Sequence, residues 1–367
     1  MTDLLERHRQ AYAYCAYCPK VCRFACPVSD ATHTETTSTW GKMTGAFLAV
    51  GGRRPLESTG ARALYACTGC MRCRSFCAHE NEVGYALFSA RKLALEREQA
   101  PPGAHSTIET FERSGNPFGR DLGAEISRHR TSHRRGGVAL FPGCSTVAKR
   151  PELLDDALAV SGELGEPLGI ADAASHCCGY PLYAAGEVDR FAQHARKLAL
   201  AIDLHPALAV LDPGCAYTFI VVYPRFGVRL RASIRTLVEV VASRLNQAPV
   251  HAPLQESATY HDACHLGRGL GQYDEPRRLL RAALSMVHEA TEKREEAGCS
   301  GGGGILPRTM PETSVTIAER LADRAAPQGD TIVTACPTSR RMFERAGRRA
   351  EDLFSVVRRW LRRSEAR

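Results

Sequence analysis

Two runs of cysteine near the start of the chain constrain its fold and chemistry more than any other feature. The first run holds Cys15, Cys18, Cys22 and Cys26 and is followed by Pro27. The second run holds Cys67, Cys70, Cys73 and Cys77 in the spacing C-x2-C-x2-C-x3-C, which is typical of loops that bind [4Fe–4S] clusters. Three closely spaced thiolates on one tight loop can bind three irons of a cube, while the cysteine beyond the longer gap reaches the neighbouring cube.

This spacing predicts two [4Fe–4S] clusters, each with ligands from both runs. The first would be held by Cys15, Cys18, Cys22 and Cys77, and the second by Cys67, Cys70, Cys73 and Cys26. The runs depart from the usual pattern in two places. Three residues rather than two separate Cys18 from Cys22, and Ala78 rather than proline follows Cys77. Neither departure removes a ligand, so the prediction of two iron-binding sites stands.

Zinc and disulfide bonds are the alternative uses of so many thiols. Eight ligands in two runs of four could hold two zinc ions, because zinc also binds paired C-x2-C sites. Disulfides are typical of secreted chains, but the segment from Thr2 to Gln10 is charged and unlike an apolar signal segment. We therefore expect a cytoplasmic protein, in which clustered cysteines more often bind metal.

The length and charge of the chain bound its possible functions. With 367 residues it can form two or three domains, and it has no window of 18 apolar residues that would predict a membrane-spanning helix. The net charge of +8 comes mostly from scattered arginines without a motif that reads nucleic acid, so we expect no nucleic-acid partner. The one concentrated group lies around Trp360 and consists of Arg358, Arg359, Arg362 and Arg363. We expect it to be the exposed face of a last helix, or else a contact for an acidic partner or the membrane surface.

The chain divides into a helical N-terminal part and two later parts in which short apolar strands alternate with helices. Residues 1–100 are predicted to form a helical, ferredoxin-like module for two clusters, and residues 101–137, rich in Gly, Pro, Ser and Arg, a linker with one helix. Residues 138–250 and 251–367 each show the alternation typical of an α/β domain with a parallel sheet. The predicted strands are 138–141, 207–211, 258–261 and 331–334. The predicted helices of these two domains are 152–164, 188–204, 234–245, 275–284, 314–326 and 351–361.

The two α/β domains repeat their cysteines at matching positions, which indicates an internal duplication. Cys144 matches Cys264, Cys177-Cys178 matches Cys299-Ser300, and Asp212-Pro-Gly-Cys215 matches Cys336-Pro-Thr-Ser339, at offsets of 120, 122 and 124 residues. Loops after the carboxyl ends of parallel strands converge at one crevice, so thiolates that are distant in sequence are expected to meet there. Gly179 and the glycine run 301–304 would let the backbone approach a bulky inorganic ligand closely.

Five segments of the α/β domains carry a resemblance to a known family. They are residues 141–144 (Phe-Pro-Gly-Cys), 177–179 (Cys-Cys-Gly), 261–267 (His-Asp-Ala-Cys-His-Leu-Gly), 299–304 (Cys-Ser followed by four glycines) and 334–338 (Thr-Ala-Cys-Pro-Thr). Together with the paired cluster motif, they resemble the iron–sulfur subunits related to heterodisulfide reductase. That family includes the iron–sulfur subunits of anaerobic glycerol-3-phosphate dehydrogenase and of glycolate or lactate oxidases. The resemblance covers nearly the whole chain, in the family's order.

The resemblance implies a thinned set of ligands, because members with the full pattern supply five thiolates per α/β domain to a non-cubane iron–sulfur site that can reduce a disulfide. Here the first α/β domain keeps Cys144, Cys177, Cys178 and Cys215, with Asp212 where the fourth cysteine of the pattern would stand. The second keeps Cys264, Cys299 and Cys336, with Ser300 and Ser339 in the other two places. We expect one further iron–sulfur centre in the first domain. In the second we expect an iron–sulfur or zinc site whose open position is filled by water, Ser300, a histidine or a substrate.

Two histidines, His261 and His265, flank Cys264. They are expected either to pack in the turn after the strand or to form hydrogen bonds with a cluster thiolate, which would tune the reduction potential of that cluster.

The thinned pattern resembles the members that relay electrons. It implies an iron–sulfur subunit that passes electrons between a flavin-containing dehydrogenase or oxidase subunit and a quinone or another carrier, in the cytoplasm or at the inner face of the cell membrane. No dinucleotide or P-loop fingerprint follows a suitable strand, so hydride transfer and nucleotide hydrolysis are not expected. Two alternatives stay open: a thiol–disulfide oxidoreductase of the heterodisulfide-reductase type, and a non-enzymatic zinc-binding module.

Overall fold

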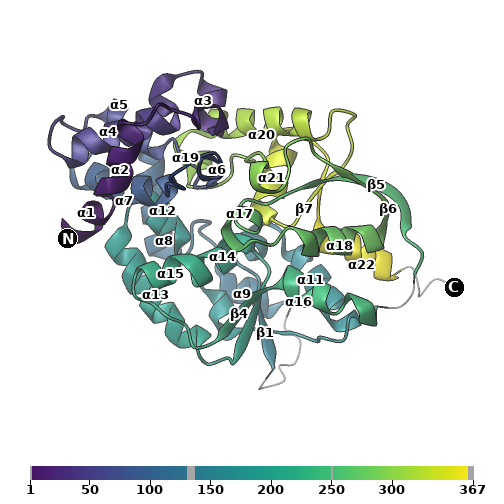
Figure 1. The fold of residues 1–367 in the computed structure, drawn as a ribbon. Helices are drawn as coiled ribbons and strands as arrows, with labels where there is room; N and C mark the ends of the chain where they lie inside the picture. Colours follow the sequence, from purple (N-terminus) through teal and green to yellow (C-terminus); the bar gives the residue numbers. More distant parts are fainter. Residues whose placement is uncertain (1, 130–136, 249–250, 363–367) are drawn as a thin grey trace.

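The computed structural model describes residues 2–129, 137–248 and 251–362, which form a helical N-terminal module and two α/β domains (Figure 1). Each α/β domain is built on a four-stranded sheet whose strands are all parallel. This architecture confirms the predicted fold class of a helical module followed by two duplicated α/β domains. Figure 1 shows the N-terminal module, in purple, packed against the rest of the molecule.

The N-terminal module consists of short helices, and most of the two cysteine runs lies in the irregular segments between them. Its helices are α1 (Thr2–Arg7), α2 (Arg9–Ala16), α3 (Pro27–Thr32), α4 (Thr39–Val50), α5 (Ser58–Tyr65), α6 (Arg72–Ser75) and α7 (Val83–Glu96). Their apolar faces form a core in which Tyr12, Met43, Tyr65 and Leu87 are buried. The hydroxyl of Tyr12 donates to the carbonyl oxygen of Ala86 at 2.7 Å, which ties α2 to α7. The helices thereby hold the two cysteine runs beside each other.

The segment expected to be a linker with one helix, residues 101–137, forms two helices in its described part. Helix α8 spans Pro102–Ser114 and α9 spans Leu122–Ser127. Phe111, Leu122 and Ile126 are buried in the core that also contains the first sheet. Residues 130–136 lie outside the described residues. Each of the two helices buries only a few apolar side chains, so the polar composition of this segment did not predict both of them.

The two sheets have the same strand order, β2-β1-β3-β4 in the first and β6-β5-β7-β8 in the second. The strands are β1 (Val138–Phe141), β2 (Gly169–Ile170), β3 (Ala207–Val210), β4 (Ser233–Thr236), β5 (Leu254–His261), β6 (Leu284–Glu289), β7 (Ile332–Thr334) and β8 (Ala350–Asp352). The shared order agrees with the duplication inferred from the repeated cysteines. The four predicted strands correspond to β1, β3, β5 and β7, which are the two central strands of each sheet.

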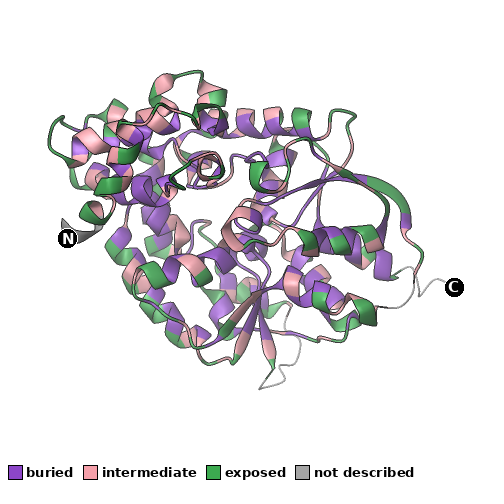
Figure 2. Ribbon diagram, in the orientation of Figure 1, coloured by how far each residue is buried: buried purple, intermediate pink, exposed green. Residues whose placement is uncertain are grey.

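Helices connect the strands, as expected for parallel sheets. The first α/β domain contains α10 (Cys144–Lys149), α11 (Pro151–Glu163), α12 (Tyr180–Ala185), α13 (Val188–Ile202), α14 (Pro213–Tyr217), α15 (Tyr223–Arg225) and α16 (Leu237–Ser243). The second contains α17 (Gly267–Leu270), α18 (Asp274–Ala283), α19 (Leu306–Thr309), α20 (Pro311–Ala325), α21 (Pro337–Arg345) and α22 (Leu353–Leu361). Figure 2 shows that buried residues follow the strands and the inner sides of these helices, and that exposed residues follow their outer sides. The sheets therefore form the centre of the core.

The last helix, α22, buries Trp360 and Leu361 in that core. Arg358 forms an ion pair with Asp156 at 3.1 Å. Arg359 forms ion pairs with Glu256 at 2.7 Å and Glu351 at 3.0 Å. Two of the four arginines around Trp360 are thus engaged within the chain, and Arg363 lies outside the described residues. In the part of the chain that the structure describes, no helix has the length and apolar character needed to cross a bilayer.

Candidate iron–sulfur sites

The four cysteines predicted to hold the first cluster lie close together. Burial and the nearby thiols of Cys22, Cys77 and Cys18 raise the pKa of Cys15 to about 12. The side-chain amide of Asn81 donates to the sulfur of Cys15 at 3.1 Å. Cys18, Cys22 and Cys77 are partly exposed, so this group of thiols lies near the molecular surface.

The four cysteines predicted to hold the second cluster, Cys26, Cys67, Cys70 and Cys73, line one small cavity. Lys42 on helix α4 lines the same cavity and is 2% exposed. Its ammonium donates to the sulfur of Cys26 at 3.1 Å and to the carbonyl oxygen of Ala66 at 2.7 Å. Burial lowers the pKa of Lys42, but the thiolates around the cavity raise it by more, so the pKa is shifted upward. The cavity therefore holds a permanent cation beside its four thiols.

The form of this second site fits a [4Fe–4S] cluster. A cube of four irons needs its thiolates around a volume rather than at one point, and the cavity between the four cysteines has that arrangement. All fifteen cysteines are free thiols and are therefore available as ligands. A buried ammonium also offsets the negative charge that four thiolates bring. The residues present thus suit a cluster with four thiolate ligands.

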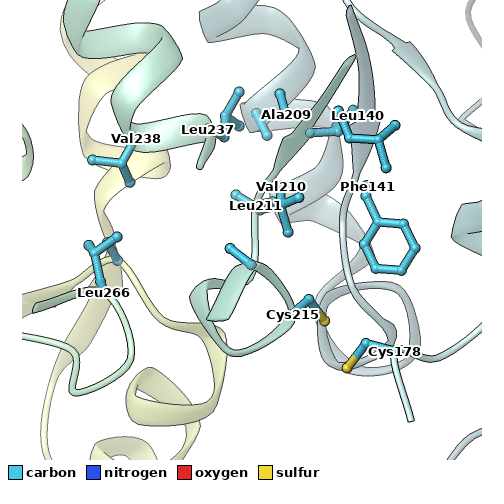
Figure 3. Close-up of a cluster of buried hydrophobic side chains, with 14 of the residues drawn as sticks. Leu140, Phe141, Cys178, Ala209, Val210, Leu211, Cys215, Leu237, Val238 and Leu266 are labelled. Carbon is cyan, nitrogen blue, oxygen red and sulfur yellow. The ribbon is translucent and has the colours of Figure 1, made fainter. Parts of the chain in front are cut away.

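In the first α/β domain, the predicted ligands form a continuous line of contacts. The sulfur of Cys144 lies 3.3 Å from that of Cys177, and the thiol of Cys178 contacts those of Cys177 and Cys215. Hydrogen bonds from these two neighbours lower the pKa of Cys178, and the same contacts raise the pKa values of its neighbours. Figure 3 shows Cys178 and Cys215 at the edge of the apolar cluster that surrounds β1 and β3. Cys178 thus lies at the centre of this line of thiols, and its pKa is the one that these contacts lower.

Asp212, which stands where the fourth cysteine of the pattern would be, lies beside this line of thiols. Its side chain accepts a hydrogen bond from the amide of Gly214 at 2.8 Å and so caps helix α14. Burial raises the pKa of Asp212 to about 6, and the neighbouring thiolate of Cys178 adds to the shift. One carboxylate oxygen thus accepts the hydrogen bond from Gly214, and the side chain lies beside the thiols of the first domain.

In the second α/β domain, the three predicted ligands are neighbours, since Cys264 contributes to the raised pKa values of both Cys299 and Cys336. Burial raises the pKa of Cys264 to about 11 and that of Cys336 to about 12. The hydroxyls of Ser300 and Ser339 hydrogen-bond to each other at 3.0 Å. These serines occupy the two positions at which the first domain has cysteines in contact. A hydroxyl pair in the second domain thus replaces a thiol pair in the first.

Cys299, the third of these ligands, joins the second α/β domain to the N-terminal module. Its thiol hydrogen-bonds to the thiol of Cys70, which lowers the pKa of Cys70 and raises that of Cys299. Its sulfur also lies 3.4 Å from the hydroxyl oxygen of Thr68. Two sulfurs that are far apart in sequence, one from each predicted site, are therefore in direct contact.

The glycines expected to approach an inorganic ligand also let the chain pack closely, and Gly302, Gly303 and Gly304 line the large cavity beside the cysteines. A Cβ at Gly303 or Gly304 would overlap with backbone carbonyl oxygens of the loop that contains Thr68, so the glycine run allows this loop to pack closely. Gly179 has φ +86, and a Cβ there would meet side chains of helix α13 at 2.8 and 3.2 Å. These glycines serve the packing of the chain against itself.

A cavity of about 610 Å³ lies between the two α/β domains, and its wall contains every cysteine that the two domains carry. Those are Cys144, Cys177, Cys178, Cys215, Cys264, Cys299 and Cys336. The wall also contains four cations, Lys149, Arg308, Arg341 and Arg345. Among the described residues, none of the four has an acidic partner within ion-pair distance. The loops after the strand ends thus converge at this cavity, as the sequence predicts. The positive charge of its wall is not predicted from the sequence.

The two histidines beside Cys264 lie in different surroundings, although burial lowers the pKa of each to about 4. The nitrogens of His261 contact the hydroxyl of Thr334 at 3.2 Å and the carbonyl oxygen of Gly298 at 3.3 Å, and this side chain does not line the cavity. His265 lines the cavity, and its Nε2 has no hydrogen-bond partner in the described chain. Of the two, His265 is the one that can contact a group in the cavity.

Lys42 and the four cavity cations are the functional candidates that sequence reasoning missed. The signal for Lys42 is a single lysine within the otherwise apolar segment that follows the first cysteine run, residues 39–50. The cavity cations carry no such signal, because they come from three helices that are distant in sequence, α10, α19 and α21, and resemble ordinary surface residues in the sequence.

Comparison with protein families matches all three parts of the chain. The family model of the 4Fe-4S dicluster domain matches residues 11–81. The family model of the cysteine-rich domain matches twice, over residues 138–220 and 258–344. These segments contain both cysteine runs and all seven cysteines of the cavity.

Curated proteins similar to this chain include several oxidoreductase components. One component of the fumarate reductase (CoM/CoB) of Methanothermobacter marburgensis is 28% identical over 280 residues, which is 75% of this chain and 55% of the relative. One component of the dihydromethanophenazine:CoB–CoM heterodisulfide reductase of Methanosarcina mazei is 25% identical, over 76% of this chain and 71% of the relative. The EtfAB:quinone oxidoreductase of Syntrophomonas wolfei is 23% identical, over 77% of this chain and 43% of the relative. The chain thus spans about half the length of several of these relatives.

These matches agree with the geometry, in which two groups of four thiols lie in the N-terminal module and the other cysteines meet between two duplicated domains. The chain thus carries a 4Fe-4S dicluster domain followed by two copies of the cysteine-rich domain, and it is similar to iron–sulfur oxidoreductase proteins related to heterodisulfide reductase.

Proposed function

We propose that this chain is the iron–sulfur subunit of an oxidoreductase complex and relays electrons between a flavin-containing dehydrogenase or oxidase subunit and a quinone or another carrier. Iron–sulfur clusters, when bound by these cysteines, take up and release single electrons. The chain itself supplies the order, spacing and surroundings of the sites. The name of one relative, an EtfAB:quinone oxidoreductase, supports a quinone as the acceptor.

The observation that carries this proposal is that the sulfur of Cys299 lies 3.4 Å from the hydroxyl oxygen of Thr68, in the loop that carries Cys67 and Cys70. This contact brings the loop of the second cluster group against a thiol that faces the large cavity. At the other end of the module, Cys22 lies close enough to Cys73 to raise its pKa, so the first and second groups are also neighbours. The ligand groups therefore form one series from the partly exposed first group to the cavity. A series without a break is what an electron relay needs.

Redox-titrated electron paramagnetic resonance on anaerobically purified protein tests this proposal. We expect about eight iron and eight sulfide for two cubes, with two cubane signals and one atypical signal from the first α/β domain. The variant Cys178→Ser should lose the atypical signal and keep both cubane signals. Thr218→Val is a matched control, because Thr218 contacts Cys178 at 3.9 Å without being a predicted ligand, and it should keep all three. Protein that contains zinc at most sites would refute the relay and support the zinc-binding alternative.

Reduction of an anionic disulfide in the large cavity is a second candidate function. The observation that favours it is a cavity wall with seven thiols and four cations that have no ion-pair partner in the described chain. Reduction of R–S–S–R consumes two electrons, delivered through the ligand groups from the partner, and two protons from water, and it yields two thiols. Oxidised glutathione, which carries carboxylates, should be turned over with reduced methyl viologen as donor, and Arg341→Gln/Arg345→Gln should lower that turnover at least tenfold. Absence of turnover in protein with intact clusters would remove this candidate.

A further inference from the structure

The first cluster group lies next to an exposed apolar surface. Tyr14, Tyr17, Val21 and Phe24 are 43%, 76%, 65% and 63% exposed. All four belong to the segment that carries the first cysteine run, and we call them the cluster-loop face. They make up four of the eight large apolar side chains that are exposed in the described chain. Apolar side chains gathered in this way on a surface otherwise covered by polar groups indicate a binding site for another molecule.

Aromatic rings from three other segments extend the cluster-loop face. Phe24 packs edge-on against Phe76 with centroids 4.8 Å apart, and Tyr17 packs against Phe47 at 5.7 Å. Tyr14 stacks on His79 at 4.8 Å. Rings held against each other lose little conformational freedom when a partner binds, and aromatic residues often supply most of the binding energy at protein interfaces.

The rim of the cluster-loop face carries positive charge. Lys20 and Arg23 share one carboxylate, that of Glu35, at 3.5 and 2.8 Å. Arg53 lies 4.9 Å from the centre of the Phe47 ring, and no carboxylate of the described chain forms an ion pair with it. Three cations and one carboxylate leave a net positive rim. A partner with acidic side chains around its contact surface complements this rim.

The thiols of the first cluster group reach this surface. Cys18 and Cys22 alternate with residues of the cluster-loop face along the chain, and both are partly exposed, as is Cys77. Three of the four cysteines of the first group are partly exposed, compared with two of the four in the second group, Cys67 and Cys73. Electron transfer slows steeply with distance, and a partner bound here would lie close to the thiols of the first cluster group.

We infer that the cluster-loop face docks a redox protein whose contact surface is apolar at its centre and acidic at its rim, and that this partner exchanges electrons with the first cluster group. This inference rests on the proposed function, because it needs the first four cysteines to hold a cluster. The face would then be one end of the relay, and the large cavity the other.

Stopped-flow reduction of the anaerobic holoprotein tests the inference with two donors, a reduced acidic flavodoxin and reduced methyl viologen. The double variant Val21→Ser/Phe24→Ser removes two apolar side chains of the face. The matched control Leu200→Ser/Leu204→Ser removes two leucines that are 74% and 75% exposed at the surface of the first α/β domain. We expect the face variant to be reduced by flavodoxin at least tenfold more slowly than the wild type, and the control variant to match the wild type. Both variants should be reduced by viologen at the wild-type rate.

Three results would overturn the inference. One is equal flavodoxin rates for the face variant and the wild type. Another is that the wild type reacts no faster with the acidic flavodoxin than with a variant of it whose surface carboxylates are replaced by lysine. A third is dimerisation of the wild type that the face variant abolishes, which would assign the face to a second copy of this chain. Failure of viologen to reduce any cluster would instead refute the proposed function, so the two failures are distinguishable.

Discussion

Replacing Lys42 by methionine should lower the reduction potential of the second cluster and leave that of the first unchanged. The ammonium of Lys42 is buried and lies 3.1 Å from the sulfur of Cys26, whereas the corresponding neighbour of Cys15 in the first group is the neutral amide of Asn81. A positive charge stabilises the reduced, more negative form of a nearby cluster. Methionine has a similar shape and no charge, so it removes this stabilisation while it fills most of the same space.

The size of the shift follows from the geometry. A unit charge about 5 Å from an added electron interacts with it by roughly 3 kcal/mol at an effective dielectric constant of about 20. A tenfold change in a one-electron equilibrium corresponds to about 59 mV, so this energy amounts to a decrease on the order of 100 mV. Only the reduction potential of the second cluster would change by that amount.

A redox titration followed by electron paramagnetic resonance measures both potentials in one sample. Lys42→Arg retains the charge and should restore most of the potential. Lys92→Met is a control for loss of a lysine from the same module, because Lys92 pairs with Asp189 at 2.6 Å near the surface and lies outside the cavity. If Lys42→Met binds both clusters and their potentials equal those of the wild type, the electrostatic reasoning is wrong.

Three further changes test the packing around the sites. Arg277→Met should destabilise the fold by roughly 3–5 kcal/mol in urea unfolding, because it leaves the buried carboxylate of Asp262 without its bidentate partner at 2.7 Å. The double variant Arg277→Met/Asp262→Asn should recover part of the lost stability. No recovery would contradict this account. Burial raises the pKa of Asp352 from 3.8 to about 7, so its stabilising contribution is complete at low pH and is lost as the pH rises through about 7. Asp352→Asn should therefore flatten the pH dependence of unfolding between about pH 4 and pH 7, and a variant with the wild-type slope would argue against a protonated carboxyl. Gly304→Ala should lower the free energy of unfolding by about 1–3 kcal/mol, because an alanine there would have φ +59 and its Cβ would overlap with the loop that contains Thr68. A variant as stable as the wild type would show that this loop can move aside.

The strands that sequence reasoning found are the central ones, and those that it missed are all at the edges of the sheets. Strands β1 and β3 are apolar and almost fully buried, so a continuous apolar run predicts them. Strand β4, with the sequence Ser-Ile-Arg-Thr, buries only its last residue, and β6 buries only its first. An edge strand is hydrogen-bonded on one side only and needs no apolar run. For this reason the pattern predicts residues 234–245 and 351–361 as helices throughout, although each begins with an edge strand.

The grouping of the cysteines could be predicted from spacing because each run is local in sequence. Which run contacts which α/β domain could not, because the contact between Cys70 and Cys299 depends on how separately folded parts pack. The glycine run beside Cys299 was visible in the sequence, but its purpose was not, since nothing local shows that it packs against the loop of Thr68. The occupants of the sites and their ligands stay predictions, and the metal analysis and spectroscopy described above test them.

The substitutions in the two α/β domains are complementary, and this bears on where a further metal centre forms. The positions of Ser300 and Ser339 in the second domain correspond to those of Cys178 and Cys215 in the first. The serine hydroxyls satisfy each other at 3.0 Å and need no metal, whereas Cys178 accepts hydrogen bonds from two thiols and is polarised toward the thiolate, the form that binds iron. We therefore expect a further metal centre in the first domain rather than in the second. We expect Ser300→Ala, which breaks only the hydroxyl pair, to leave the number of bound irons unchanged, and a loss of iron in this variant would show that the serine is a ligand after all.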